Sequence, residues 1–188
     1  MHDNEKIVAW AQDHLAIKGY TIDKPYELVC AMPWSRVIRF STQHGLVYCK
    51  QMIPLFYIEP ALMQMLSQCF PANIPKVIAS NSDLCCFLMH DACTPLRGHL
   101  KTHYQTDLFC KALKAYASIQ YTTIKHVDTL LSVGLQDWRL AKLPALYLQL
   151  INNTDLLKAD GYKKQKQDIW HYKMYILNIG LNMRQWIN

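Results

Sequence analysis

The chain has 188 residues, of which 51% are hydrophobic and 18% charged, and its formal net charge is +6. This composition excludes an intrinsically disordered chain and suffices for one sizeable domain or two small lobes. No stretch is long and apolar enough to span a membrane, and the first residues lack the apolar run of a secretory signal. We therefore expect a soluble protein.

The seven cysteines are odd in number and irregularly spaced. Several lie inside apolar strand or helix patterns, where a free cysteine behaves as a small hydrophobic residue. This pattern favours a reducing, cytoplasmic setting over a disulfide framework. We expect no metal site built from these cysteines.

A helix and three short strands are predicted for the first part of the chain. Apolar residues recur at helical spacing over 7–15, and Gly19 suits the end of that helix. Strands are expected at 27–30, 37–40 and 46–51, where β-branched and aromatic residues alternate with turn-like segments. Short connections between successive strands predict an antiparallel meander.

One helix and two further strands follow. The helix is expected at about 60–70, with Pro60 in its first turn, where a missing N–H has no cost. The strands are expected at 77–79 and 85–89, joined by a turn at 80–83. The predicted order is therefore three strands, a helix and two strands.

Beyond residue 96 the pattern is helical, with a composition shift at 91–98 that marks a lobe boundary. Pro144 is expected to kink or split one of the helices. The fold class is therefore α+β, with a sheet lobe at 1–96 and a helical lobe at 97–188. The expected helices of the second lobe are 106–121, 123–133, 135–152 and 165–186, the first two bracketed by Thr106 and Gly134 as caps.

Lys50 on the third strand and Glu59 just before the helix are the candidate functional pair. A positioned lysine suits the binding of nucleotide phosphates. Two simpler interpretations remain open. Lys50 can be an ordinary solvent-facing side chain, and Glu59 can merely stabilise the positive end of the helix.

Five segments follow one another along the chain: PWSRVIRF, GLVYCKQM, FYIEPALMQML, IPKVIAS and CCFLMHDACTPLRGHL. Together with the order of the predicted elements, they resemble a protein-kinase-like phosphotransferase, and specifically the amino-terminal part of the aminoglycoside phosphotransferase family. The later stretch AYASIQYTTIKHVDTLLSVGLQDWRLAKLP resembles the helices that precede the catalytic loop in that family. The resemblance covers about residues 26–144.

This resemblance implies an ATP site with Mg²⁺. Lys50 is expected to contact the α- and β-phosphates, and Glu59 to pair with Lys50 and fix its direction. The turn that contains Trp34 and Ser35 is expected to cover the phosphates.

The base of the nucleotide is expected at a hinge between the two lobes. By the same resemblance, backbone groups of His90 and Ala92 meet the edge of the adenine. Val37, Cys49 and Leu88 are expected to form the apolar walls, since ligand clefts are mostly apolar.

The catalytic part of the family's pattern is not found in this sequence. The family carries a His-Gly-Asp loop with an asparagine five residues after the aspartate, followed by a second aspartate. His126-Val127-Asp128 has a similar spelling, but Val133 stands at the asparagine position, and Asp160-Gly161 is expected in a turn. The catalytic residues and the phosphoryl acceptor are therefore unknown, and the chain resembles a truncated phosphotransferase.

An alternative is a non-catalytic, pseudokinase-like interaction module. Helix faces left uncovered in an incomplete lobe are expected to bind another protein or a second copy of the chain. Nucleic-acid binding is less favoured, because lysine clusters commonly coat a solvated helix. The lysines concerned are Lys158, Lys163, Lys164, Lys166 and Lys173.

Overall fold

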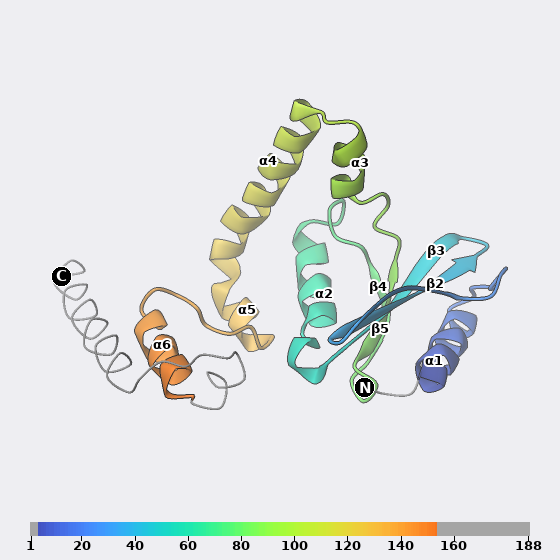
Figure 1. Cartoon of the computed structure of the whole chain (residues 1–188), viewed down its shortest axis with the longest axis horizontal. Coiled ribbons are helices and arrows are strands. Elements are labelled where there is room, and N and C mark those ends of the chain that lie inside the picture. Colours follow the sequence, from blue (N-terminus) through green and yellow to red (C-terminus); the bar gives the residue numbers. More distant parts are fainter. Residues whose placement is uncertain (1–3, 154–188) are drawn as a thin grey trace. The chain divides into compact units, whose positions relative to one another are not determined.

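The computed structural model describes residues 4–153. The chain divides into two compact units, residues 1–135 and residues 136–188. The first unit holds a five-stranded antiparallel sheet in the order β1-β2-β3-β5-β4 (Figure 1). Residues 97–135 belong to the same compact unit as the sheet, whereas the sequence placed a lobe boundary after residue 96.

The strands follow the predicted order, with three strands, a helix and two strands. The first three form the expected meander, because β1 pairs with β2 and β2 with β3, both antiparallel. The last strand along the chain, β5, lies between β3 and β4. The strands are β1 (Glu27–Met32), β2 (Ser35–Thr42), β3 (Gly45–Met52), β4 (Val77–Asn81) and β5 (Cys86–His90).

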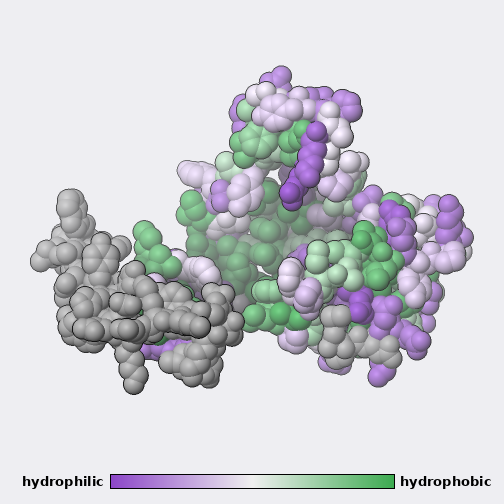
Figure 2. Space-filling view, in the orientation of Figure 1, coloured by the Kyte–Doolittle hydropathy of each residue, from purple (hydrophilic) through white to green (hydrophobic). Residues whose placement is uncertain are grey.

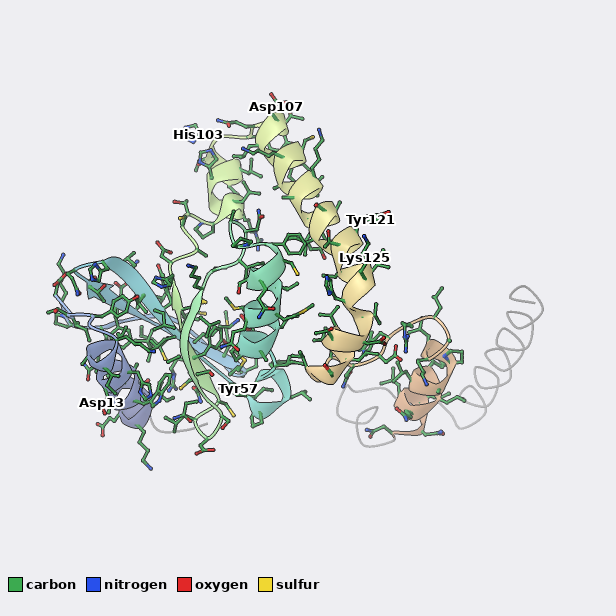
Figure 3. The ribbon with its side chains drawn as sticks, turned by 180° about the vertical axis from the view of Figure 1, so that it is seen from behind. Asp13, Tyr57, His103, Asp107, Tyr121 and Lys125 are labelled. Atoms are coloured by element: carbon green, nitrogen blue, oxygen red, sulfur yellow. The ribbon has the colours of Figure 1, made fainter. Side chains whose placement is uncertain are left out.

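Helix α1 (Asn4–Ile17) packs against one face of the sheet. Its buried residues recur at helical spacing, and Asp13 lies on the side away from the sheet (Figure 3). Gly19 ends the helix with a φ of 80°, as predicted. The Tyr20 N–H then donates to the Leu15 carbonyl at 2.9 Å, which satisfies a carbonyl of the last turn.

The alternation of side chains along β3 separates a core face from an open face. Val47 and Cys49 are fully buried in the cluster that α1 covers. Tyr48 and Lys50 therefore point to the opposite face, because successive side chains of a strand alternate. The side chain of Lys50 is only partly exposed, so other residues cover part of this second face.

Helix α2 (Glu59–Cys69) follows a short 3-10 turn, η1 (Pro54–Phe56), which the sequence did not predict. It begins at Glu59, one residue before the predicted start, with Pro60 in its first turn. Helix α2 contacts β4, so the helix that carries Glu59 is attached to the sheet that carries Lys50.

The helices after the sheet differ in part from the prediction. The predicted helix 123–133 is interrupted by a 3-10 turn, although Gly134 does end it with a φ of 104°. The N-cap of α4 is Gln105, which makes no side-chain bond, so the predicted cap at Thr106 is wrong. The elements are α3 (Leu96–Thr102), which the sequence missed, α4 (Thr106–Thr123), η2 (Ile124–His126) and α5 (Val127–Ser132).

The second unit is described over residues 136–153. The predicted helix 135–152 is wrong over its first part, because α6 (Leu143–Asn152) begins with Pro144 in its first turn. The Asp137 carboxylate accepts the backbone N–H of Arg139 at 3.2 Å and two bonds from its guanidinium. Such local side-chain bonds compete with helix formation. The predicted helix 165–186 and Asp160-Gly161 lie outside the described residues.

Apart from Cys30, which is half-buried, the cysteines fall into two environments. Cys49, Cys85 and Cys86 are buried, whereas Cys69, Cys93 and Cys110 are exposed. A hydrogen bond to Cys86, together with burial, raises the pKa of the Cys49 thiol well above its usual value. Cys49 and Cys86 therefore serve as small apolar core residues.

Hydrophobic side chains also gather on the surface, over α2 and α4 (Figure 2). On α4, Phe109, Leu113 and Tyr116 are exposed at spacings of four and three residues. Tyr121, farther along the helix, points away from α2 (Figure 3). Within residues 4–153, no helix combines the length and apolar character that crossing a bilayer requires.

The buried stripe of α1 generates the first prediction. Leu15 is fully buried and Ile17, two residues away, is 75% exposed. We expect Leu15→Ala to lower the free energy of unfolding by about 2–5 kcal/mol, since it leaves a cavity under the sheet. Ile17→Ala, the matched control, should change it by less than about 0.5 kcal/mol. Urea unfolding followed by circular dichroism measures both, and equal losses would contradict the position of α1.

Candidate functional site

Lys50 and Glu59 form an ion pair on the open face of the sheet. The Lys50 ammonium donates to both carboxylate oxygens of Glu59, at 2.7 and 2.5 Å. Strand β3 positions the lysine, and the first turn of α2 positions the acid. The predicted pair is present, and Lys50 is therefore not a free solvent-facing side chain.

The environment of this pair is intermediate between core and surface. The side chains of Lys50 and Glu59 are 26% and 35% exposed, respectively. An ammonium carries three N–H donors, so the contacts to Glu59 leave a donor for a ligand. Because the carboxylate lies at the positive end of α2, it is stabilised by the helix as well as by the lysine.

Strand pairing brings aromatic and apolar side chains next to Lys50. Val37 lies opposite Lys50 on β2, and Phe87 lies opposite it on β5. Tyr48, two residues before Lys50, shares the same face and has Met89 as its neighbour on β5. Tyr48, Phe87 and Met89 are not among the site residues that we predicted from the sequence. The two-residue alternation along the strand of Lys50 was a sufficient signal for Tyr48.

Two of the predicted apolar walls are wrong. Cys49 and Leu88 are fully buried in the cluster with α1, on the face opposite to Lys50. Each is adjacent in sequence to a residue of the open face, and adjacent side chains of a strand point to opposite sides. Only Val37 of the predicted walls lies on the face of Lys50.

Trp34 and Ser35 lie at the tip of the β1–β2 hairpin. Met32 pairs with Ser35, so residues 33 and 34 form the turn, and Trp34 is exposed. The Trp34 carbonyl accepts the backbone N–H of Ile53 at 3.1 Å, just beyond β3. This bond fixes the turn beside the end of the strand that carries Lys50. Ser35 shares the face of Val37 and Lys50, because it lies two residues before Val37.

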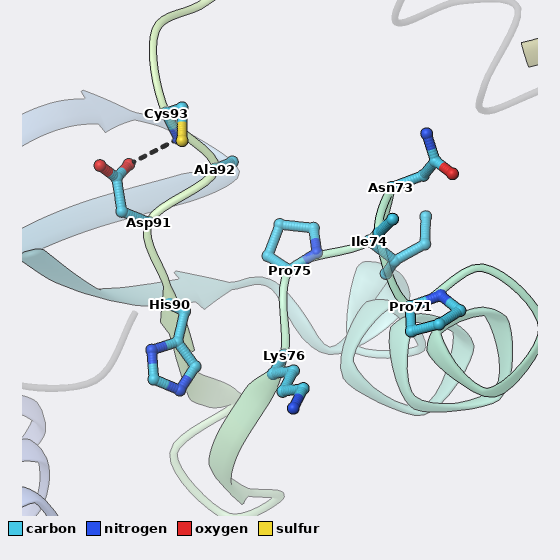
Figure 4. A pocket seen from close by; sticks show the side chains of 10 residues that line it. Pro71, Asn73, Ile74, Pro75, Lys76, His90, Asp91, Ala92 and Cys93 are labelled. Carbon is cyan, nitrogen blue, oxygen red and sulfur yellow. Dashed lines mark hydrogen bonds between the residues drawn. The ribbon is translucent and has the colours of Figure 1, made fainter. Parts of the chain in front are cut away.

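His90 and Ala92 lie at a different place. The His90 N–H donates to the Lys76 carbonyl at 3.0 Å, so it is not available to a base. His90 Nε2 lies 3.4 Å from the Tyr20 hydroxyl. His90 and Ala92 line an open pocket of about 460 Å³ between residues 71–76 and 90–93 (Figure 4). In this pocket the Asp91 carboxylate accepts a hydrogen bond from the Cys93 N–H at 3.0 Å. Neither Lys50 nor Glu59 lines that pocket, so the predicted site residues do not share one cavity.

The segment His126-Val127-Asp128, whose sequence is similar to that of the family's catalytic loop, is part of a helical region. Asp128 lies in the first turn of α5, and His126 Nε2 lies 3.9 Å from the Cys69 sulfur at the end of α2. Among residues 4–153, no three histidine, cysteine or acidic side chains gather as ligands for a metal ion. The C-terminal lysines considered for nucleic-acid binding lie outside the described residues.

No known family profile matches this chain, and no curated protein sequence matches it. The interpretation of the site therefore depends on its geometry: a cation held by a carboxylate, beside an aromatic and apolar strip, at the open face of an antiparallel sheet.

The ion pair generates the second prediction. In a double-mutant cycle of Lys50→Met and Glu59→Gln, we expect a coupling energy of about 0.5–1 kcal/mol, since the pair is partly shielded from water. Urea unfolding of the four proteins measures it. The matched control is Arg39 with Glu27, an ion pair whose partners are 35% and 60% exposed, for which the coupling should be smaller. Zero coupling between Lys50 and Glu59 would contradict the geometry of the site.

Proposed function

We propose that the sheet unit is a nucleotide-binding lobe of the protein-kinase-like phosphotransferase type, which binds ATP with Mg²⁺ through Lys50. The observation that carries this proposal is the bidentate contact between Lys50 on the third strand and Glu59 at the start of the following helix. In protein kinases, a lysine of the third strand pairs with a glutamate of that helix and holds the nucleotide phosphates.

The strip beside Lys50 supports a place for the base. Tyr48 lies two residues from Lys50 along β3, a spacing of about 7 Å in an antiparallel strand. With the phosphates at Lys50, the base would lie against Val37 and Tyr48, which face the same side. An aromatic ring next to an aliphatic side chain suits a flat, mostly apolar ligand.

The β1–β2 turn supports a cover for the phosphates. Its attachment to Ile53 keeps the turn at the end of β3, and Ser35 offers a hydroxyl on the face of Lys50. Trp34 and Ser35 are therefore proposed for this role. The His90 N–H is not a proposed contact of the base, because it donates to the Lys76 carbonyl. Ala92 stays a proposed contact through its backbone only.

The proposal concerns nucleotide binding rather than turnover. Phosphoryl transfer needs a carboxylate that orients the attacking hydroxyl and side chains that hold the metal. Residues 4–153 offer no such set next to Lys50, so we assign no residue to Mg²⁺ and no acceptor.

The third prediction tests the role of Lys50. Titration of the chain with Mg-ATP by isothermal calorimetry should show weak binding, and Lys50→Ala should weaken it at least about tenfold, equivalent to about 1.4 kcal/mol. Lys114→Ala removes the same charge from the exposed surface of α4 and is the matched control. It should leave the affinity within about twofold, because exposed charges at a distance are screened by salt.

Two outcomes would contradict this function. The first is the absence of binding by the unaltered chain, which would favour the alternative of a non-catalytic interaction module. The second is binding that Lys50→Ala leaves unchanged, which would place the nucleotide elsewhere on the protein.

A further inference from the structure

Two exposed histidines lie side by side at the end of α3. His99 is in the last turn of the helix, and His103 is the residue that caps it. Their rings are stacked, with centroids 6.0 Å apart and an angle of 29° between the planes. Residues four apart share one face of a helix. Two histidines at this spacing on a helix can bind the same zinc ion.

Hydrogen bonds of the last turn hold the two histidines at this spacing. The backbone N–H of His103 donates to the His99 carbonyl at 2.9 Å. The Thr102 hydroxyl donates to the same carbonyl at 3.0 Å. The backbone that joins the two rings is therefore already closed into one turn, which lowers the entropic cost of binding an ion between them.

Thr102 also determines which ring nitrogen of His103 is free. His103 Nδ1 lies 3.1 Å from the Thr102 hydroxyl oxygen. The single hydrogen of this hydroxyl is donated to the His99 carbonyl, so the oxygen can only accept from the ring. Nδ1 therefore carries the hydrogen, and Nε2 keeps its lone pair. A metal-binding histidine has the same arrangement, with its other ring nitrogen donating to an oxygen.

The ring of His99 has both nitrogens available. Within residues 4–153, its contact is the stacking on His103, and no hydrogen bond occupies either of its nitrogens. Imidazole nitrogen suits zinc, copper and nickel, whereas Mg²⁺ prefers oxygen ligands. The pair therefore selects a transition-metal ion and is unsuited to the Mg²⁺ that accompanies ATP.

The separation of the rings favours a tetrahedral ion. Two imidazoles that bind one tetrahedral zinc ion at about 2.0–2.1 Å have ring centroids about 5 Å apart. The observed 6.0 Å exceeds this by about 1 Å. Small rotations of the side chains can close this gap, because both are exposed. A square-planar Cu²⁺ ion would need neighbouring rings still closer together.

We propose that His99 and His103 form an open, two-histidine site for Zn²⁺. Among residues 4–153, no third histidine, cysteine or acidic side chain joins them. The remaining positions of a tetrahedral ion are therefore open to water or to an added ligand, unlike a closed structural site with four protein ligands. A bound ion links the two ends of the last turn. It therefore stabilises α3, whose seven residues are too few for a stable isolated helix.

The fourth prediction is that the whole chain binds Zn²⁺ through both histidines. Competition with a chromogenic zinc indicator measures the affinity, and Mg²⁺ should not compete. The exposed Cys69, Cys93 and Cys110 are replaced by serine in every protein compared, because thiolates also bind zinc. His99→Gln and His103→Gln should each weaken binding at least about tenfold, because the second imidazole binds at a high effective concentration.

His44→Gln is the matched control, since His44 is also exposed but lies in the β2–β3 turn. It should leave the affinity within about twofold, because removing a distant histidine does not change this chelate. Circular dichroism checks that all variants fold. The absence of zinc binding overturns the proposal. So does an affinity that His99→Gln or His103→Gln leaves unchanged, or one that His44→Gln lowers equally.

NMR spectra of the histidine side chains provide an independent readout. Long-range proton–nitrogen spectra of the chain labelled with ¹⁵N-histidine distinguish the two ring nitrogens. Without metal, His103 should be in the Nδ1–H form, and Thr102→Val should reduce the fraction of that form. Zn²⁺ should shift Nε2 of His103 and one ring nitrogen of His99, but not the ring of His44. Shifts that are absent from His99 and His103, or equal at His44, would contradict the site.

Discussion

The packing of α1 against one face of the sheet is the constraint on which the rest of this unit depends. Burial of Val47 and Cys49 beneath the helix fixes which residues of β3 point inward. A slip of one residue would exchange Cys49 with Lys50 and place an ammonium in the core, at a high cost in desolvation. The apolar pattern of α1 and β3 therefore directs Lys50 to the open face, where α2 supplies Glu59.

The local order of the sheet unit could be predicted from the sequence because it depends on short-range signals. β-Branched and aromatic runs marked the strands, and Gly19 marked the end of α1. The Lys50–Glu59 pair was also predictable, since Lys50 lies on a predicted strand and Glu59 directly precedes a predicted helix. The walls Cys49 and Leu88 were wrong because the side of a strand on which a residue lies depends on the position of α1. The His90 N–H was misjudged because its partner, the Lys76 carbonyl, lies on another segment.

The helical part was harder to predict for a related reason. The sequence predicted a helix through 135–152 with a kink or split at Pro144, and α6 does begin there, with Pro144 in its first turn. The part before Pro144 is not helical, because Asp137 and Arg139 hydrogen-bond to each other locally. The edge of β1 shows the opposite case. Its exposed apolar residues looked like an ordinary strand in the sequence, and only the strand order places them at an edge of the sheet, which no element within residues 4–153 covers.

Affinity labelling tests whether Lys50 faces bound nucleotide phosphates, as we propose. An acyl-phosphate derivative of ATP transfers its acyl group to a lysine amine that lies beside the phosphates, and mass spectrometry identifies the modified residue. We expect Lys50 to be modified in preference to surface lysines such as Lys114, and unmodified ATP to protect Lys50 from modification. Labelling of Lys50 at the rate of Lys114, without protection by ATP, would mean that Lys50 does not face the phosphates.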